Sequence, residues 1–191
     1  MASKAGDEAP VIAFRDAPAF EAWLDEHADD QSGVWLKLAK KNSGIRSLTD
    51  DEAVDVGLCY GWISGQRKSL DDTYYLQKYV PRRPRSRWSQ VNVAKVGELT
   101  AAGRMRPRGL AEVAAAKTDG RWDAAYESQR NATVPPDLAA ALAASPAAAR
   151  AFDALGRTGR YAVIHKLITA RTATARITQL RKAIAELASP T

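Results

Sequence analysis

The sequence predicts an α+β fold, with a small antiparallel sheet and helices in the N-terminal half and an all-helical C-terminal half. Two observations lead to this prediction. Runs rich in β-branched and aromatic residues all lie before residue 81, and apolar residues after residue 89 recur at helical spacing with no strand-like run between them. Strands alternating with helices along the whole chain would instead indicate a parallel α/β sheet.

In the N-terminal half, the predicted strands cover residues 11–14, 34–38, 62–66 and 73–80. A helix is predicted between the first two strands, because Asp16 can cap it and apolar positions recur through His27. A second helix begins at Thr49, which with Glu52 can form a capping box, and ends near residue 61. A short polar connection joins the last two strands, which favours an antiparallel pair.

After the proline-rich loop that begins at Pro81, the predicted helices cover residues 90–102, 107–116, 138–142, 146–155, 160–171 and 175–187. We expect residues 1–10 to be a disordered tail and residues 11–103 to form an α+β core that contains a basic aromatic segment. We expect residues 104–191 to form a helical region packed on that core, so that the chain is one domain.

The few cysteines and histidines exclude several classes of protein. A lone cysteine, Cys59, cannot form an internal disulfide, so disulfide-rich secreted proteins are excluded and a cytoplasmic location is predicted. Packing is the favoured role for Cys59, and hydrogen-bonded structural roles are favoured for His27 and His165. These residues lack metal-ligand spacing, so no metal is predicted. No other cofactor is predicted, because the glycines at residues 57, 61 and 65 lack the context of a nucleotide-binding loop. The absence of a long apolar run argues against membrane insertion.

Positive charge is concentrated in one part of the sequence. The net charge is −6 over residues 1–77, +8 over residues 78–108 and +4 over residues 109–191, which gives +6 for the chain. The basic part contains more Arg than Lys, and the guanidinium group suits planar anions such as carboxylates and phosphates. Pairing with nearby acidic side chains, or solvation in a loop, would explain the same residues without a ligand.

Aromatic and basic side chains alternate over residues 62–88, and this pattern predicts a binding surface for an anionic or planar ligand. The candidate binding residues are Trp62, Gln66, Lys68, Tyr74, Arg82, Arg83, Arg85 and Trp88. No catalytic residue is assigned. Trp62 and Trp88 border the ends of predicted elements, so a role in the core is the competing interpretation for both.

Several short motifs occur in a fixed order along the chain. They are Thr49-Asp50-Asp51-Glu52, Gly61-Trp62-Ile63-Ser64-Gly65, Pro81-Arg82-Arg83-Pro84, Ser86-Arg87-Trp88-Ser89, Gly103-Arg104-Met105 and Gly120-Arg121-Trp122-Asp123. From about residue 14 to residue 187 the chain resembles the bacterial YdeI/OmpD-associated family, also called the bacteriocin-protection family. The resemblance implies a link to tolerance of antimicrobial peptides and to an outer-membrane porin, but no reaction, cofactor or catalytic set. The family commonly has Asp where this chain has Ser64.

Three functions follow from these observations. The leading hypothesis is a cytoplasmic protein that binds a small anionic or planar ligand, or a peptide, and that acts in antimicrobial-peptide or envelope stress tolerance. One alternative is nucleic-acid association through residues 78–108, although no nucleic-acid-binding motif supports it. The other is a cofactor-free enzyme with acid–base groups drawn from His27, His165, Asp55, Asp71 and Asp72. The oligomeric state stays open.

Overall fold

The computed structural model describes residues 9–170 and 172–189, which form two compact units. Within the described residues, the N-terminal unit comprises residues 9–88 and 92–125, and the C-terminal unit comprises residues 89–91 and 126–189. Most of the tail predicted over residues 1–10, namely residues 1–8, lies outside the described residues, as does residue 171, the predicted end of one helix. The α+β class is confirmed: strands occur in the N-terminal unit, and helices follow them.

The N-terminal unit contains a four-stranded mixed sheet in the order β1-β2-β4-β3. Its strands are β1 (Val11–Ile12), β2 (Val34–Ala39), β3 (Trp62–Ser69) and β4 (Tyr74–Pro81). The β2–β4 and β3–β4 pairs are antiparallel, as predicted for the latter, but β1 pairs with β2 in parallel. The wholly antiparallel sheet is therefore corrected to a mixed one. Between β1 and β2 the chain passes through a helix, and such a crossover lets both strands run in the same direction.

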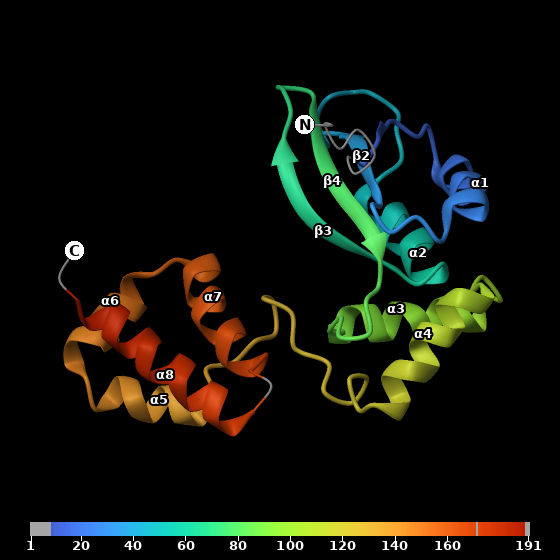
Figure 1. The fold of residues 1–191 in the computed structure, drawn as a ribbon. Coiled ribbons are helices and arrows are strands. Elements are labelled where there is room, and N and C mark those ends of the chain that lie inside the picture. Colours follow the sequence, from blue (N-terminus) through green and yellow to red (C-terminus); the bar gives the residue numbers. More distant parts are fainter. Residues whose placement is uncertain (1–8, 171, 190–191) are drawn as a thin grey trace, which may run out of the picture. The chain divides into compact units, whose positions relative to one another are not determined.

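Helices of the N-terminal unit are α1 (Ala17–His27), α2 (Asp50–Cys59), α3 (Gln90–Ala101) and α4 (Pro107–Thr118). The first two residues of α3 belong to the C-terminal unit. The predicted capping box is present at the start of α2: Thr49 accepts a hydrogen bond from the Glu52 backbone N–H, and the Glu52 carboxylate accepts one from that of Thr49. Within this unit, α1 and α2 pack against one face of the sheet (Figure 1).

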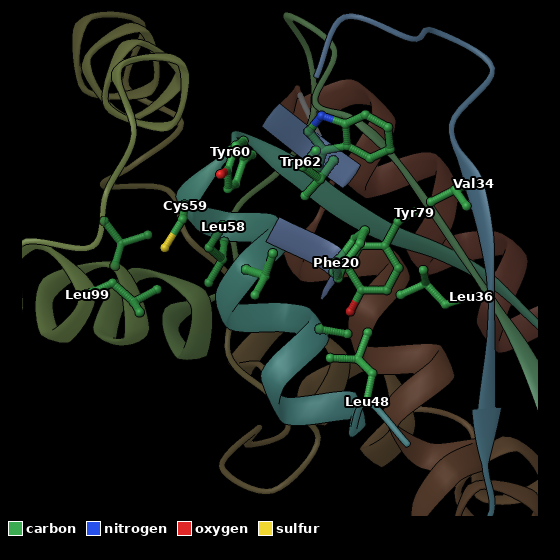
Figure 2. Close-up of a cluster of buried hydrophobic side chains, with 14 of the residues drawn as sticks. Phe20, Val34, Leu36, Leu48, Leu58, Cys59, Tyr60, Trp62, Tyr79 and Leu99 are labelled. Atoms are coloured by element: carbon green, nitrogen blue, oxygen red, sulfur yellow. The ribbon is translucent and has the colours of Figure 1, made fainter. Parts of the chain in front are cut away.

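The core of the N-terminal unit lies between that face of the sheet and the helices. Phe20 of α1, Leu36 of β2, Trp62 of β3 and Tyr79 of β4 are all buried there in one cluster (Figure 2). Cys59 is buried in the same cluster, and burial raises the pKa of its thiol. This environment suits a packing residue, because the thiolate is the reactive form of cysteine.

The described C-terminal unit has a separate apolar core formed by four helices, α5 (Pro136–Ala143), α6 (Pro146–Ala154), α7 (Arg157–Ile168) and α8 (Ala173–Ala188). Leu138, Phe152, Ile164 and Leu167 are its main buried side chains. Among the described residues, no helix combines the length and the hydropathy that crossing a bilayer requires.

Candidate functional site

The eight candidate binding residues fall in different environments. Trp62 lies in the core with no exposed surface, and its indole N–H donates a hydrogen bond to the Ala28 carbonyl at 3.0 Å. Lys68 and Tyr74 lie on the face of the sheet opposite the core, while Arg83 and Arg85 are exposed in the loop after β4. Trp62 therefore supports the fold rather than presenting a ring to a ligand.

Arg82 and Trp88 lie near the two ends of the loop between β4 and α3, and their side chains stack on each other. The guanidinium carbon of Arg82 lies 3.6 Å from the Trp88 ring centroid, and the two residues are 4% and 1% exposed. Nη1 of Arg82 donates to the Arg87 carbonyl at 3.1 Å, and the Ser86 hydroxyl accepts from the Arg83 backbone N–H at 2.9 Å. This stack holds the loop in shape, and its burial keeps both side chains from a dissolved ligand.

A second layer supports the same loop. The rings of Trp122 and Trp88 lie 5.0 Å apart between centroids, and Arg121 donates to the Ser86 carbonyl at 2.9 Å. Arg121 also pairs with Asp119. The Gly-Arg-Trp-Asp motif at residues 120–123 therefore packs against the loop between β4 and α3.

The outer face of the sheet, away from the core, carries lysines placed over aromatic rings. Nζ of Lys68 lies 4.1 Å from the Trp35 ring centroid, and Nζ of Lys78 lies 5.3 Å from the same centroid. Nζ of Lys37 lies 4.1 Å from the Tyr74 ring centroid. We call these five residues the lysine face. Each ammonium group gains cation–π attraction from the ring below it.

Strand register explains why these residues share one face. Trp35 of β2 is paired with Lys78 of β4, and Leu76 of β4 is flanked by Lys37 on β2 and Lys68 on β3. Paired residues of neighbouring strands point to the same side of a sheet. Since β4 lies between the other two strands, the backbones that carry Lys37 and Lys68 are about 10 Å apart.

An irregularity in β3 places Lys68 on this face. Ser64 pairs with Tyr79 and Arg67 pairs with Gln77, so two residues of β3, Gly65 and Gln66, stand opposite the single residue between Tyr79 and Gln77. Strict alternation from Trp62 would point residue 68 toward the core, and the extra residue reverses this. Gln66 is exposed, and its backbone carbonyl accepts a hydrogen bond from the Gln77 side chain at 3.1 Å.

Arg67 consequently points to the core side of the sheet. Its guanidinium donates to the Gln77 side chain at 2.7 Å and to both carboxylate oxygens of Asp50, at 2.8 and 2.9 Å. It also lies 4.6 Å from the Tyr75 ring centroid. The extra residue in β3 therefore puts two adjacent basic residues on opposite faces of the sheet. Lys68 lies on the outer face, while Arg67 links β3 to α2 on the core side.

Within the described residues, no carboxylate forms an ion pair with Lys37, Lys68 or Lys78. Asp71, in the turn between β3 and β4, accepts hydrogen bonds from the backbone N–H groups of Tyr74 and Thr73. These bonds, and to a smaller extent the charge of Lys37, lower the pKa of the Asp71 carboxyl. The positive charge of the lysine face is therefore available to an external anion.

Sequence reasoning missed Trp35, Lys37 and Lys78. The alternation over residues 34–38 contained the signal for two of them, because it puts Trp35 and Lys37 on the face opposite Leu36. The pairing of Lys78 with Trp35 depends on the register between β2 and β4, which residues 40–73 separate in sequence.

Among the candidate acid–base groups of the enzyme hypothesis, His27, His165 and Asp55 have local roles, as Asp71 does in its turn. His27 stacks on Trp23 with centroids 4.3 Å apart, and its Nδ1 lies 2.8 Å from the Trp23 carbonyl oxygen. Asp55 pairs with Lys95 at 2.7 Å. In the C-terminal unit, His165 packs edge-on against the Tyr126 ring. These contacts are typical of structural histidines and surface ion pairs.

The mixed sheet with its helices, followed by a four-helix unit, defines a two-part α+β protein. Two different family models match the chain, one in each of these parts. Residues 12–112, a little over half of the chain, match the family described as a domain of unknown function (DUF8412), and the chain belongs to this family. Residues 131–189 match the family described as Bacteriocin-protection, YdeI or OmpD-Associated. Neither a curated protein nor a solved structure matches the chain.

The resemblance to the YdeI/OmpD-associated family is thus confirmed, over a narrower range than residues 14–187. The motifs at residues 49–105 lie within the other family's match, while Gly120-Arg121-Trp122-Asp123 lies between the two matches. The lysine face belongs to the first matched region, and α5 to α8 belong to the second.

Proposed function

We propose that this chain is a binding protein whose lysine face holds an extended acidic peptide segment. The observation that carries the proposal is the set of three ammonium groups, Lys37, Lys68 and Lys78, which lie over aromatic rings on adjoining strands and which no described carboxylate pairs. Arg83 and Arg85, exposed in the loop after β4, add long-range attraction for the same partner.

The spacing of the lysines favours an extended partner over one small anion. Two lysine positions are about 10 Å apart across the sheet, and Lys78 lies two residues, about 7 Å, along β4 from Leu76. Alternate side chains of an extended peptide are also about 7 Å apart. The three lysines belong to three strands, so a peptide with several carboxylates contacts more of them at once than a single carboxylate or phosphate does.

The aromatic rings of the lysine face are largely covered, and this favours carboxylates over nucleotide bases as ligands. Single-stranded nucleic acids gain much of their affinity by stacking bases on accessible aromatic faces. Trp35 is only 8% exposed and has Lys68 over its ring, while Tyr74 has Lys37 over its ring. The lysine face therefore offers charge without a free stacking platform, so a nucleic acid is the less favoured partner.

A fluorescence anisotropy titration with a labelled alternating glutamate–serine peptide tests this proposal. The variant K37Q/K68Q/K78Q removes three positive charges from the lysine face. We expect it to bind the peptide at least about tenfold more weakly, because three exposed ion pairs together contribute about 1.5 kcal/mol or more. Affinity for the wild-type protein should fall as salt rises.

The matched control is K41Q/K166Q/K182Q, which removes the same charge from exposed lysines elsewhere, and we expect less than a twofold change. If both variants bind the peptide equally weakly, the net charge of the protein rather than the lysine face governs binding, and the proposal is overturned. Tighter binding of an oligothymidylate than of the peptide, lost only in the lysine-face variant, would replace the peptide with a nucleic acid.

We further propose that this binding underlies a role in antimicrobial-peptide or envelope stress tolerance. The support is the description of the family that matches residues 131–189, which names bacteriocin protection. A basic face repels cationic peptides, so the proposed route is capture of an acidic partner rather than of the toxin. Expression in a bacteriocin-sensitive strain should raise survival with the wild type and with the control variant, but not with K37Q/K68Q/K78Q.

A further inference from the structure

The C-terminal unit contains a groove of its own. It lies among residues 129–134, the end of α6 and the start of α7, and it has a volume of about 550 Å³. Small-molecule sites in proteins typically have volumes of about 300–1,000 Å³. The groove is thus large enough for a small organic ligand, and it is separate from the lysine face, which belongs to the N-terminal unit.

One part of the groove wall is apolar. Val134, Leu155 and Ile164 line it together with Tyr161. The Tyr161 hydroxyl donates a hydrogen bond to the Glu127 carbonyl at 2.9 Å, which fixes the position of the ring. Val134 is 41% exposed even though its side chain is apolar. An aliphatic ligand would remove this surface from water, and the burial of apolar surface favours binding.

The rest of the wall is basic. Arg130, Arg157 and Arg160 line the groove, and no Asp or Glu is among the described residues that line it. Arg160 is held in place, because its guanidinium donates to the carbonyls of Leu155 and Asp153 at the end of α6. Within the described part of the chain, Arg130 and Arg157 form no ion pair with a carboxylate.

The helix that begins at this groove adds to the positive potential. Gly156 is the N-cap of α7, and the cap makes no side-chain hydrogen bond with the first turn. The backbone N–H groups of that turn carry the positive end of the helix dipole. This contribution is secondary to the guanidinium groups, which carry full charges.

We infer that this groove binds an amphiphilic anion, with a carboxylate or phosphate head at the arginines and a short alkyl body against Val134, Leu155 and Ile164. Guanidinium groups pair with either kind of head through charge-assisted hydrogen bonds. The three arginines select for the charge, and the apolar wall selects for the alkyl body. The inference does not depend on the proposed function of the lysine face.

Titrations followed by ¹H–¹⁵N NMR test the inference, with octyl phosphate and octanoate as probes. The amides of Leu155 and Gly156, two residues that line the groove, should shift as either probe is added. Octanol, which lacks the charge, and inorganic phosphate, which lacks the alkyl body, should each bind at least about tenfold more weakly than octyl phosphate. Octyltrimethylammonium should leave both amides unmoved.

The variant R130Q/R157Q should weaken octyl phosphate binding by about tenfold or more, since each lost charge-assisted hydrogen bond removes more than a neutral one would. Its control, R150Q/R181Q, removes the same charge from exposed positions on α6 and α8 of the same unit and should change affinity less than twofold. Arg160 is left intact because it caps the end of α6.

Three results would overturn the inference. Octanol binding as tightly as octyl phosphate would remove the role of the arginines. Inorganic phosphate binding as tightly would remove the role of the apolar wall. Equal weakening in the two arginine variants would show that net charge, rather than the groove, governs binding. If octanoate alone leaves the amide signals unshifted, the groove accepts a phosphate head group but not a carboxylate. Its assignment as a site for an amphiphilic anion then stands.

Discussion

Two glycines in neighbouring helices of the N-terminal unit have opposite surroundings. A Cβ atom at Gly109, in the first turn of α4, would lie 2.2 Å from the Cys59 carbonyl oxygen and 2.8 Å from that of Leu58. A Cβ atom at Gly97 in α3 would meet nothing within 4 Å. Gly109 therefore allows α4 to approach the end of α2, whereas Gly97 has no such task.

We expect G109A to lower the free energy of unfolding by about 3 kcal/mol, because overpacking against rigid backbone costs this much or more. G97A should raise the same free energy by about 0.5–1 kcal/mol, since alanine reduces the entropy of the unfolded chain and favours a helix. Urea denaturation of the two variants and the wild type measures both changes. A G109A protein as stable as the wild type would contradict the close contact between α4 and Cys59.

At the scale of single residues, the sequence indicated the right types of residue but not their environments. Trp62 and Trp88 border element ends, as predicted, and both are core residues. Strand pairing places the ammonium groups of the lysine face. Lys78 contacts Trp35 only because the register between β2 and β4 pairs these two residues. Local sequence does not encode that distant pairing.

At the scale of elements, α5 and α8 of the C-terminal unit are joined by one ion pair. Nε and Nη2 of Arg176 donate to the two carboxylate oxygens of Asp137 at 2.7 and 2.8 Å. The adjacent guanidinium lowers the pKa of the Asp137 carboxyl. A lowered pKa in the folded state means that folding gains stability while the carboxylate is ionised.

We expect D137N to destabilise the C-terminal unit at pH 7 by about 1 kcal/mol or less, because both side chains are about one-third exposed and water screens the pair. The difference from the wild type should persist above pH 4, near the usual Asp pKa. It should vanish as pH falls through the lowered pKa of the folded state, because wild-type Asp137 is then neutral as well. Thermal melts at pH 7 and at acid pH measure this, with D153N as an exposed control. A difference that is the same at both pH values would contradict the ion pair.

Elements with local start and stop signals were predictable from the sequence. The capping box at Thr49 and the prolines at the starts of α4 and α6 gave these helices within a few residues of their observed bounds. The parallel pairing of β1 and the extra residue in β3 were not predictable, because both depend on how a strand meets a partner far away in sequence.

At the scale of the whole molecule, two separate apolar cores form among the described residues, one in each unit. All five tryptophans, Trp23, Trp35, Trp62, Trp88 and Trp122, belong to the N-terminal unit. Tryptophan emission therefore reports the unfolding of that unit, while far-UV circular dichroism follows the helices of both.

We expect the two units to unfold in separate transitions, since neither core includes residues of the other. G109A should shift the transition seen by tryptophan emission, and D137N should shift only the remaining change in circular dichroism. The two shifts should add in the double variant, because the sites share no partners. A single transition, moved equally by either substitution in both signals, would contradict independent units.

The extra residue in β3 also determines which length changes the strand tolerates. Deleting Gly65 would leave Gln66 alone opposite Lys78, which restores regular pairing and keeps Arg67 and Lys68 on their present sides. A deletion beyond the bulge, between Arg67 and the turn, would instead exchange inward and outward positions for the residues it moves. Natural variation in the length of β3 itself should therefore concentrate at Gly65 and Gln66, where losing a residue leaves both surfaces of the sheet unchanged.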